Sequence, residues 1–550
     1  MSRRIIMILL SLRIIKLLAL FSILFSFYAF AGTFYVACYY YDSDKGPYNK
    51  NSSLMTPSKL YIGANTNYFW ALNDANQYTK LNGTVIDGFF IEEYLTRSEV
   101  EKHCQNAIKN GTFFWKSKVT LKLLDYKAAT SNFDGFEYPI RFLKDNNNYA
   151  KIKQIILFGD SLSDTGNLKR WTKYMPGYPG FFGRFTDFYN WIDFLAGMQP
   201  NKGPHYPVLN FAYGGAKSDG SNDFYFNNLK NYMTSLGRNF VTGSSKDYIN
   251  HFLNSYLTQD SYASKSPYIS NSDEILFVIW IGANDYISKL ESPIFTQEFF
   301  DNPNKIGGST TVYKRSVENI SEQINILYNR GARHFLIFNL PDFGRTPVVL
   351  DTRYKIKDIE NPTDERNKIA FSQKITKVID NHNKTLQLKI KEIETIKKDI
   401  DITYVDIFKG FNSFIEGKNI IDGSNFNYET QPLDSKYLIP GTTNKYIQEV
   451  CYTGGYIGAA KALVKSDFSA NTYALRSSCH RQSESESDGL DKISATTVFW
   501  NNPHPSSYAH CWISFMARKA LEDKGLIPKE LTTLEDYKNY CFSILKLKYN

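Results

Sequence analysis

One short stretch, residues 155–167, places a serine where it could take part in chemistry. It reads I-I-L-F-G-D-S-L-S-D-T-G-N, so an apolar run stops abruptly at Gly159, Asp160 and Ser161. An apolar run ended by glycine is typical of a buried parallel strand entering a tight turn, and open α/β sheets bind ligands at that end. The helix expected to follow would supply unpaired N–H groups that suit an oxyanion. The alternative interpretation is a serine that merely caps a helix.

Acyl transfer by a serine also needs a base and fixed hydrogen-bond donors for the oxyanion. His504 is a candidate base, because prolines on both sides stiffen its loop. Gly214 and Gly215 are adjacent, and glycines let a backbone N–H approach a substrate closely. Asn284 directly follows an apolar run, in the sequence G-A-N-D. Taken singly, each glycine-containing segment is more simply an ordinary turn.

Taken together and in this order, the four segments resemble the blocks of the GDSL (SGNH) esterase and lipase family. The nine residues 159–167 match its first block, and the His-Pro at His504 matches its last. Within the family the chain is similar to secreted bacterial phospholipases and lysophospholipases of the thermolabile hemolysin type, over residues 34 to about 521. The resemblance implies that Ser161 is the nucleophile and His504 the general base. It further implies an oxyanion hole made by the N–H groups of Ser161 and Gly215, with Gly214 as the alternative, and the amide of Asn284.

One position departs from the family pattern. The family usually has an aspartate three residues before the histidine, and here that residue is Asn501. An aspartate would orient the imidazole and stabilise its protonated form, whereas asparagine carries no charge. Three interpretations follow: a backbone carbonyl, water or anion orients His504, which we favour; Asp488 or Asp491 reaches in; or the enzyme is weak or inactive.

The order of expected elements predicts an α/β fold. Apolar strands alternate with helical patterns from residue 151 onward, which argues for a parallel sheet covered by helices on both faces. The resemblance implies the three-layer α/β/α, flavodoxin-like architecture of SGNH hydrolases. We expect strands at 275–281 and 334–340, a weaker strand at 403–407, and helices at 311–330 and 366–398.

The expected domains are a small β-rich amino-terminal domain at 32–150 and a hydrolase domain at 151–550. The first contains strand-favouring runs, and residues 145–148 read as a linker. A segment rich in Asn, Ser, Thr and Gly, at about 420–486, reads as a surface insertion. Strands of the small domain are expected at 34–41, 61–63, 88–91 and 119–124.

Length and charge narrow the function classes. At 550 residues the chain is too long for one ordinary core, and its 39 Tyr and 40 Phe argue against disorder. Four basic residues and no acid lie in the first 31 positions, and subtracting them from the net charge of +9 leaves +5. This charge is compatible with an anionic membrane surface and far too weak to imply nucleic acid.

Residues 1–31 read as a secretory signal peptide. Basic residues precede an uncharged, mostly apolar run, and A-F-A stands before a cleavage site at Gly32. The competing interpretation is a retained membrane anchor, but the uncharged part is shorter than the roughly 20 residues that a span needs. We therefore expect a secreted protein that passes through the periplasm.

An even number of cysteines in an exported chain favours disulfides. There is no C-x-x-C or H-E-x-x-H, so a zinc site has little support, and the resemblance implies no metal or organic cofactor. The hemolysin-like proteins carry cysteines at the first two of three nearest-neighbour pairs, and the third rests on proximity in sequence alone. The pairs are Cys38–Cys104, Cys451–Cys479 and Cys511–Cys541.

The resemblance therefore predicts a secreted serine ester hydrolase that releases fatty acids from glycerophospholipids or lysophospholipids at a membrane surface. Acyl transfer to a sterol is a related activity of similar proteins. Two other interpretations stay open: an esterase for carbohydrate or small soluble esters, since the blocks fix the chemistry and not the substrate, and a catalytically weak lipid-binding protein.

Overall fold

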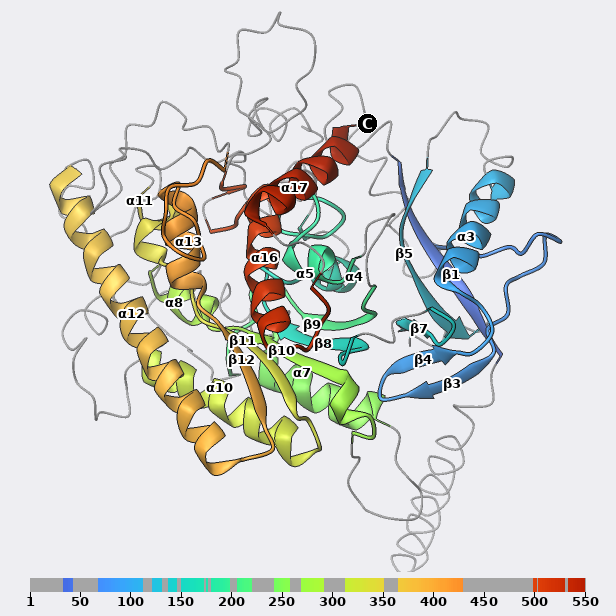
Figure 1. Ribbon diagram of the computed structural model, residues 1–550, viewed down its shortest axis with the longest axis horizontal. Coiled ribbons are helices and arrows are strands. Elements are labelled where there is room, and N and C mark those ends of the chain that lie inside the picture. The colour runs from blue at the N-terminus through green and yellow to red at the C-terminus, as the bar shows by residue number, and fades with distance from the viewer. Residues whose placement is uncertain are drawn as a thin grey trace, which may run out of the picture.

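A β-rich region and a larger α/β region stand side by side in the computed structural model (Figure 1). The predicted signal peptide, the strand at 61–63, residues 146–148 of the linker, and Cys451 and Cys479 lie outside the described residues. The structure describes residues 33–42, 68–111, 121–130, 137–145, 150–172, 175–176, 180–197, 205–219, 242–257, 269–290, 312–350, 365–428, 498–501, 503–529 and 533–549.

The α/β region is built on a five-stranded parallel sheet in the order β12-β11-β10-β8-β9. Gly159 pairs with Trp280 on one side and with Ala212 on the other, so these three strands end level with one another. The turns after them therefore meet at one end of the sheet, and they contain the predicted segments with Ser161, with Gly214 and Gly215, and with Asn284. The strands are β8 (Gln154–Gly159), β9 (Val208–Ala212), β10 (Ile275–Trp280), β11 (His334–Phe338) and β12 (Asp401–Val405).

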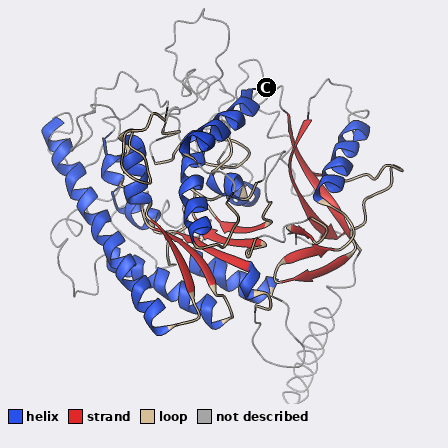
Figure 2. Cartoon of the chain, viewed as in Figure 1, coloured by secondary structure: helices blue, strands red, loops and turns tan. Residues whose placement is uncertain are grey.

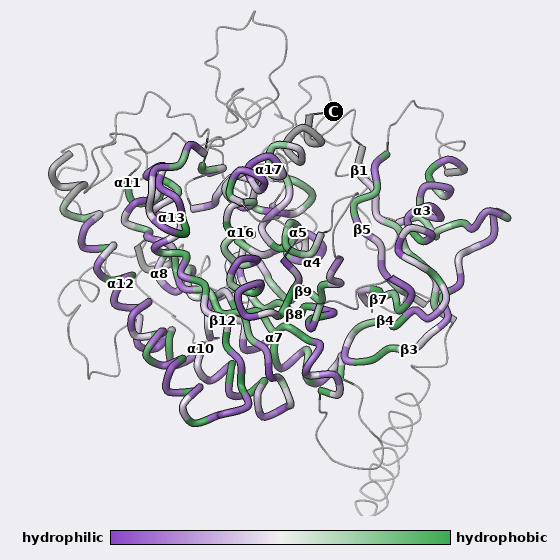
Figure 3. Tube along the Cα trace, viewed as in Figure 1, coloured by the Kyte–Doolittle hydropathy of each residue, from purple (hydrophilic) through white to green (hydrophobic). Residues whose placement is uncertain are grey.

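Helices cover both faces of this sheet (Figure 2), as predicted. Successive strand residues face opposite layers: Ile156 and Phe158 pack toward α7, α10 and α12, whereas Leu157 packs toward α5, α13 and α16. The strands are mostly apolar because both faces are buried, and Figure 3 colours much of α12 as more hydrophilic than these strands. The main helices are α4 (Asn167–Thr172), α5 (Trp191–Leu195), α7 (Ser245–His251), α8 (Ala283–Leu290), α10 (Val312–Asn329), α11 (Pro347–Leu350), α12 (Glu365–Ile396), α13 (Ile407–Ile415), α16 (Ser507–Asp523) and α17 (Leu534–Tyr549). Short one-turn helices occupy Phe252–Tyr256, Ser272–Glu274 and Phe343–Arg345.

The weak strand expected at 403–407 begins and ends two residues earlier, as β12. The cause is a helix cap: Asp406 accepts a hydrogen bond from the backbone N–H of Lys409 and starts α13 at Ile407. The first residues of the predicted insertion, 420–428, pack back onto the α/β region. Tyr428 is buried there against Phe414 and Trp512, and residues 429–497 lie outside the described part.

The described part of the amino-terminal region contains short strands and a helix, α3 (Arg97–Gly111). The helix was not predicted from the sequence. Thr96 and Glu99 form a capping box at the start of α3. The disulfide Cys38–Cys104 ties this helix to β1, and a second disulfide, Cys511–Cys541, joins α16 to α17. The strands are β1 (Phe34–Asp42), β2 (Tyr68–Trp70), β3 (Gly83–Ile86), β4 (Phe89–Glu92), β5 (Leu121–Thr130), β6 (Glu137–Tyr138) and β7 (Ile140–Phe142). They form one four-stranded antiparallel sheet and one three-stranded sheet in which β4 and β7 are parallel.

Buried and half-buried polar contacts join the two regions. Asp87 accepts hydrogen bonds from Ser270 and Asn271, and Arg141 forms an ion pair with Glu274. Whether residues 32–150 form a domain of their own stays a prediction. In the part of the chain that the structure describes, no helix has the length and apolar character needed to cross a membrane.

Candidate active site

The structure brings Ser161 and His504 together across 343 positions of sequence. Ser161 follows β8 directly, and His504 lies in the loop before α16. The Oγ of Ser161 is 2.7 Å from Nε2 of His504, within hydrogen-bond distance for transfer of the serine proton. His504 is buried, with 5% of its surface exposed, whereas Ser161 is half-buried. The candidate nucleophile is thus more accessible than the candidate base.

Asn501 fixes the tautomer of His504. Its Oδ1 lies 2.8 Å from Nδ1 of the imidazole and also accepts the backbone N–H of His504 at 3.2 Å. Because a backbone N–H can only donate, the atom facing it must be the amide oxygen rather than the amide nitrogen. Nδ1 therefore carries the proton, and Nε2 is left as the acceptor toward Ser161. The contact comes from the Asn501 side chain itself, which differs from the backbone carbonyl, water or anion that we favoured; Asp488 and Asp491 lie outside the described residues.

Burial sets the charge of this histidine. Removal from water, with a smaller contribution from nearby His510, lowers the pKa of His504 to about 3. Among the described residues no carboxylate opposes this effect, because the position of the usual aspartate is the neutral amide of Asn501. The imidazole is therefore neutral over a wide pH range.

The predicted oxyanion donors are close to one another in the fold. Asn284 lies in the first turn of α8 and donates a hydrogen bond from its side-chain amide to the carbonyl of Ala216 at 3.0 Å, next to Gly215. In the described part of the chain, the backbone N–H groups of Ser161 and Gly215 have no acceptor. These donors are available to a ligand, as an oxyanion hole requires.

Gly214 and Gly215 are each required to be glycine, but for different structural reasons. Gly215 has φ of +86°, a conformation that favours glycine, whereas a Cβ on Gly214 would lie 2.2 Å from the Phe185 ring. That ring in turn packs on His504, with centroids 5.1 Å apart. Gly214 therefore allows its turn to approach Phe185, the residue that packs against His504.

Asp164 holds the turn that carries Ser161 against the turn that carries Gly214. This role was not predicted from the sequence. Its carboxylate accepts four backbone N–H groups, including that of Gly214 at 2.9 Å. Burial raises the pKa of Asp164 to about 6, and these hydrogen bonds limit the rise. The signal was available, because Asp164 belongs to the nine-residue block that carries the resemblance.

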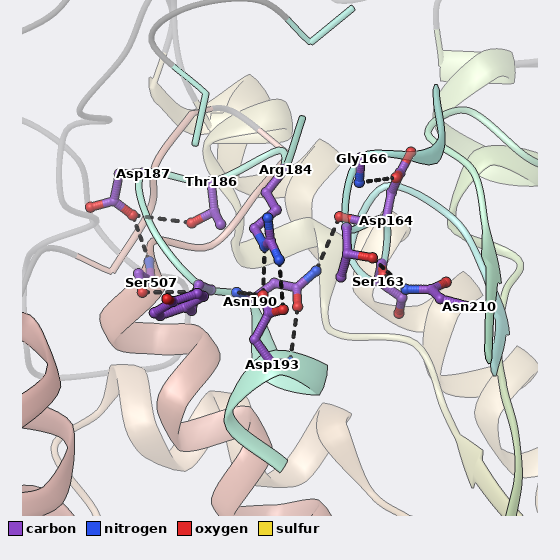
Figure 4. Close-up of polar contacts among 12 residues, drawn as sticks. Ser163, Asp164, Gly166, Arg184, Thr186, Asp187, Asn190, Asp193, Asn210 and Ser507 are labelled. Carbon is purple, nitrogen blue, oxygen red and sulfur yellow. Dashed lines mark hydrogen bonds and ion pairs between the residues drawn. The ribbon is translucent and has the colours of Figure 1, made fainter. Parts of the chain in front are cut away.

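Residues 184–190, whose role was also not predicted from the sequence, connect the turn that carries Ser161 to the loop that carries His504 (Figure 4). Asn190 donates to the carbonyl of Asp164 at 3.1 Å, on the serine side. On the histidine side Thr186 donates to the carbonyl of Pro505, and Asp187 accepts the N–H of Ser507 at 2.7 Å. All of these groups are buried, so the segment fixes the two loops relative to each other. The bidentate ion pair between Arg184 and Asp193 anchors it to α5.

An apolar pocket opens beside the serine and histidine. Ser161, Asn284 and His504 contribute polar groups to its lining, and the remaining walls are almost entirely apolar. Gly215 is not among the lining residues. Within the described residues, no group of His, Cys, Asp or Glu is arranged to hold a metal ion. The apolar walls include Trp280, Ile287, Phe343, Phe411, Phe499 and Ile513.

A serine hydroxyl held against a neutral imidazole at the carboxyl ends of parallel strands is an arrangement typical of serine hydrolases. Comparison with known proteins agrees: the GDSL-like Lipase/Acylhydrolase model matches residues 155–514, and the chain belongs to this family.

Individual relatives are distant. The chain is 27% identical to the phosphatidylcholine-sterol acyltransferase of Aeromonas hydrophila over 35% of its own length and 46% of the relative. It is 25% identical to an acetylesterase of Thermothelomyces thermophilus, over 48% of this chain and 74% of the relative. It is 23% identical to the thermolabile hemolysin of Vibrio parahaemolyticus, over 58% of this chain and 65% of the relative. The chain thus spans about half of the first of these proteins and about two thirds of the third.

Proposed function

We propose that the protein is an exported serine ester hydrolase that releases fatty acids from glycerophospholipids or lysophospholipids. The observation that carries the proposal is the apolar pocket that begins at Ser161 and His504. An acetyl group would leave most of such walls without contact, whereas a fatty acyl chain would cover them. The names of the Aeromonas and Vibrio relatives support a phospholipid substrate at a membrane surface.

The proposed reaction uses the groups in their observed positions. Oγ of Ser161 attacks the ester carbonyl carbon as its proton passes to Nε2 of His504, 2.7 Å away. The N–H groups of Ser161 and Gly215 and the amide of Asn284 stabilise the oxyanion. His504 then protonates the departing alcohol oxygen, leaving an acyl ester on Ser161. Water attacks this ester with His504 again as base, so the fatty acid leaves and the serine regains its proton.

Asn501 orients the base but carries no charge. We therefore propose that the enzyme is active, but slower than one with an aspartate at this position. In the serine proteases, replacing the orienting aspartate by asparagine costs about 10⁴ in turnover because the tautomer is wrong. Here the acceptor atom faces Nδ1, so that particular loss does not apply. Only the stabilisation of the imidazolium by a carboxylate is missing.

Export is part of the proposal. The basic and apolar pattern of residues 1–31 supports it. The two disulfides of the described region support it as well, because disulfides persist in oxidising compartments.

The test is fatty acid release from phosphatidylcholine and lysophosphatidylcholine vesicles by the oxidised protein. We expect release that Ser161→Ala abolishes and that the exposed control Ser255→Ala leaves unchanged. An acetylesterase is the second candidate, since one relative carries that name. Turnover of p-nitrophenyl acetate with no release from either lipid would favour it. Ester made with added cholesterol would instead indicate acyl transfer, and lipid binding without turnover would indicate a binding protein.

A further inference from the structure

A second pocket, which we call the junction pocket, lies between the amino-terminal β region and the α/β region. Lys127 and Tyr39 line it from the first region, and Lys169, Arg184 and Val208 line it from the second. It shares none of its lining residues with the pocket beside Ser161. The chemistry proposed for Ser161 does not use it.

Among the described residues that line the junction pocket, Lys169 is a buried cation without an acidic partner. Lys169 is 9% exposed and, in the part of the chain described by the structure, has no hydrogen bond and no ion pair. Lysine is almost never buried to this degree unless it is paired, because removal of an ammonium from water is costly. Burial accordingly lowers the pKa of Lys169 to about 8, with no carboxylate to raise it.

The other cations of the pocket have acidic partners. Arg184 is held by Asp193 through two hydrogen bonds of 2.6 and 2.7 Å. Lys127 lies 3.6 Å from Asp125. Arg170, which is partly exposed, lies 3.8 Å from Glu137. The Lys169 ammonium is therefore the unbalanced charge among these lining groups.

The stem of Lys169 packs against the backbone of Gly183. A Cβ placed on Gly183 would lie 2.9 Å from Cβ of Lys169 and 3.4 Å from its Cδ, so the chain of Gly183 packs directly along the lysine stem. Gly183 has φ of +87°, which favours glycine at this position. The contact holds the stem in place within the lining of the junction pocket.

The remaining walls are mostly apolar, so the pocket suits a ligand with one negative charge and a hydrocarbon body. Leu124, Ile140, Phe182, Ile192 and Val208 supply these walls. A phosphate ion would satisfy the charge but leave the walls uncovered, and an alcohol would cover the walls but leave the charge.

We propose that the junction pocket binds an organic carboxylate with an apolar body, its carboxylate held by the ammonium of Lys169. Such a ligand would contact both regions at once and stabilise their packing. A medium- or long-chain fatty acid belongs to this class. The inference does not depend on which ester the enzyme hydrolyses.

The test uses the full oxidised protein and isothermal titration with octanoate, octan-1-ol and inorganic phosphate. We expect saturable binding of octanoate, a rise in melting temperature with octanoate, and weaker binding of the other two probes. Lys169→Met should weaken octanoate binding about 10- to 100-fold, the range for loss of a charge-assisted hydrogen bond. The exposed control Lys151→Met should bind as the wild type does.

A second variant separates binding from folding. Val208 also lines the junction pocket, so Val208→Trp should fill the cavity while keeping the charge, and it should also abolish octanoate binding. Melting curves of both variants report whether they fold, and we expect Lys169→Met to melt no lower than wild type because it removes an unpaired charge. Octanoate binding that persists in folded Lys169→Met overturns the proposal, as does phosphate binding as tightly as octanoate. Binding lost in Ile287→Phe, beside Ser161, but kept in Lys169→Met would also overturn it.

Discussion

Replacing Asn501 by aspartate tests the role proposed for His504 as the catalytic base. The carboxylate would take the place of Oδ1, 2.8 Å from Nδ1 of His504. A negative charge at this distance favours the imidazolium, so the variant must raise the pKa of His504 from its value of about 3. An opposite charge this close shifts a pKa by roughly 1–3 pH units, which corresponds to about 1.4–4 kcal/mol.

The sign of the pH effect follows from the role of the base. The imidazole must be neutral to accept the proton of Ser161, so activity falls as the pH drops through its pKa. In the wild type this acid limb should lie well below the ordinary histidine value of about 6.5. Asn501→Asp should move it upward by roughly 1–3 pH units. At pH 8 the imidazole of His504 is neutral in both the wild type and Asn501→Asp. There the variant should turn over roughly tenfold faster, because its carboxylate stabilises the imidazolium formed during the reaction; this factor equals about 1.4 kcal/mol of barrier.

The assay is hydrolysis of p-nitrophenyl butyrate from pH 3 to 9, with samples quenched in alkali before reading. The exposed Asn329→Asp, at the opposite edge of the sheet, controls for a general change in charge. An acid limb that stays in place or moves downward in Asn501→Asp, with the control unchanged, would refute the contact between Asn501 and Nδ1.

Three further predictions concern the surrounding structure. Gly214→Ala should lower kcat/KM by at least tenfold, because the new methyl displaces Phe185 from His504; equal activity in this variant and wild type would contradict the packing argument. Ile287→Phe narrows the pocket beside Ser161 and should lower kcat/KM for octanoyl esters at least tenfold more than for acetyl esters, a preference that competition assays measure directly. Cys511→Ser with Cys541→Ser opens a loop of 30 residues and should cost about 3–4 kcal/mol of stability in urea unfolding, whereas an unchanged midpoint would mean that the disulfide does not constrain the unfolded chain.

Sequence alone located the parallel sheet because its strands are buried on both faces. Continuous apolar runs such as that of β10 leave few other interpretations, and the helical spacing of α10 is equally regular. The helix α3 was missed, although Thr96 and Glu99 carry the pattern of a capping box, because the surrounding strand-favouring aromatic residues dominated the interpretation. A short local pattern such as a capping box is easily outweighed by the amino-acid composition of the surrounding sequence.

The candidate site was predictable where chemistry dictates residue type and not where packing does. Ser161 and His504 lie in motifs, so their meeting could be expected. The role of residues 184–190 could not, because Thr186 and Asp187 act through contacts with a loop more than 300 positions away. The position of Asn501 was predicted, but the atom that contacts the imidazole depends on the exact turn of the loop.

The most direct test of the central claim is covalent trapping of the nucleophile. The oxidised protein is treated with a p-nitrophenyl ester of hexadecylphosphonic acid, from which an activated serine displaces p-nitrophenolate, and the modified peptide is mapped by mass spectrometry. The account predicts modification of Ser161 alone, lost in His504→Ala and at least tenfold slower with a methyl phosphonate because the apolar pocket binds the long chain. Modification of another serine, or equal rates for both reagents, would contradict it.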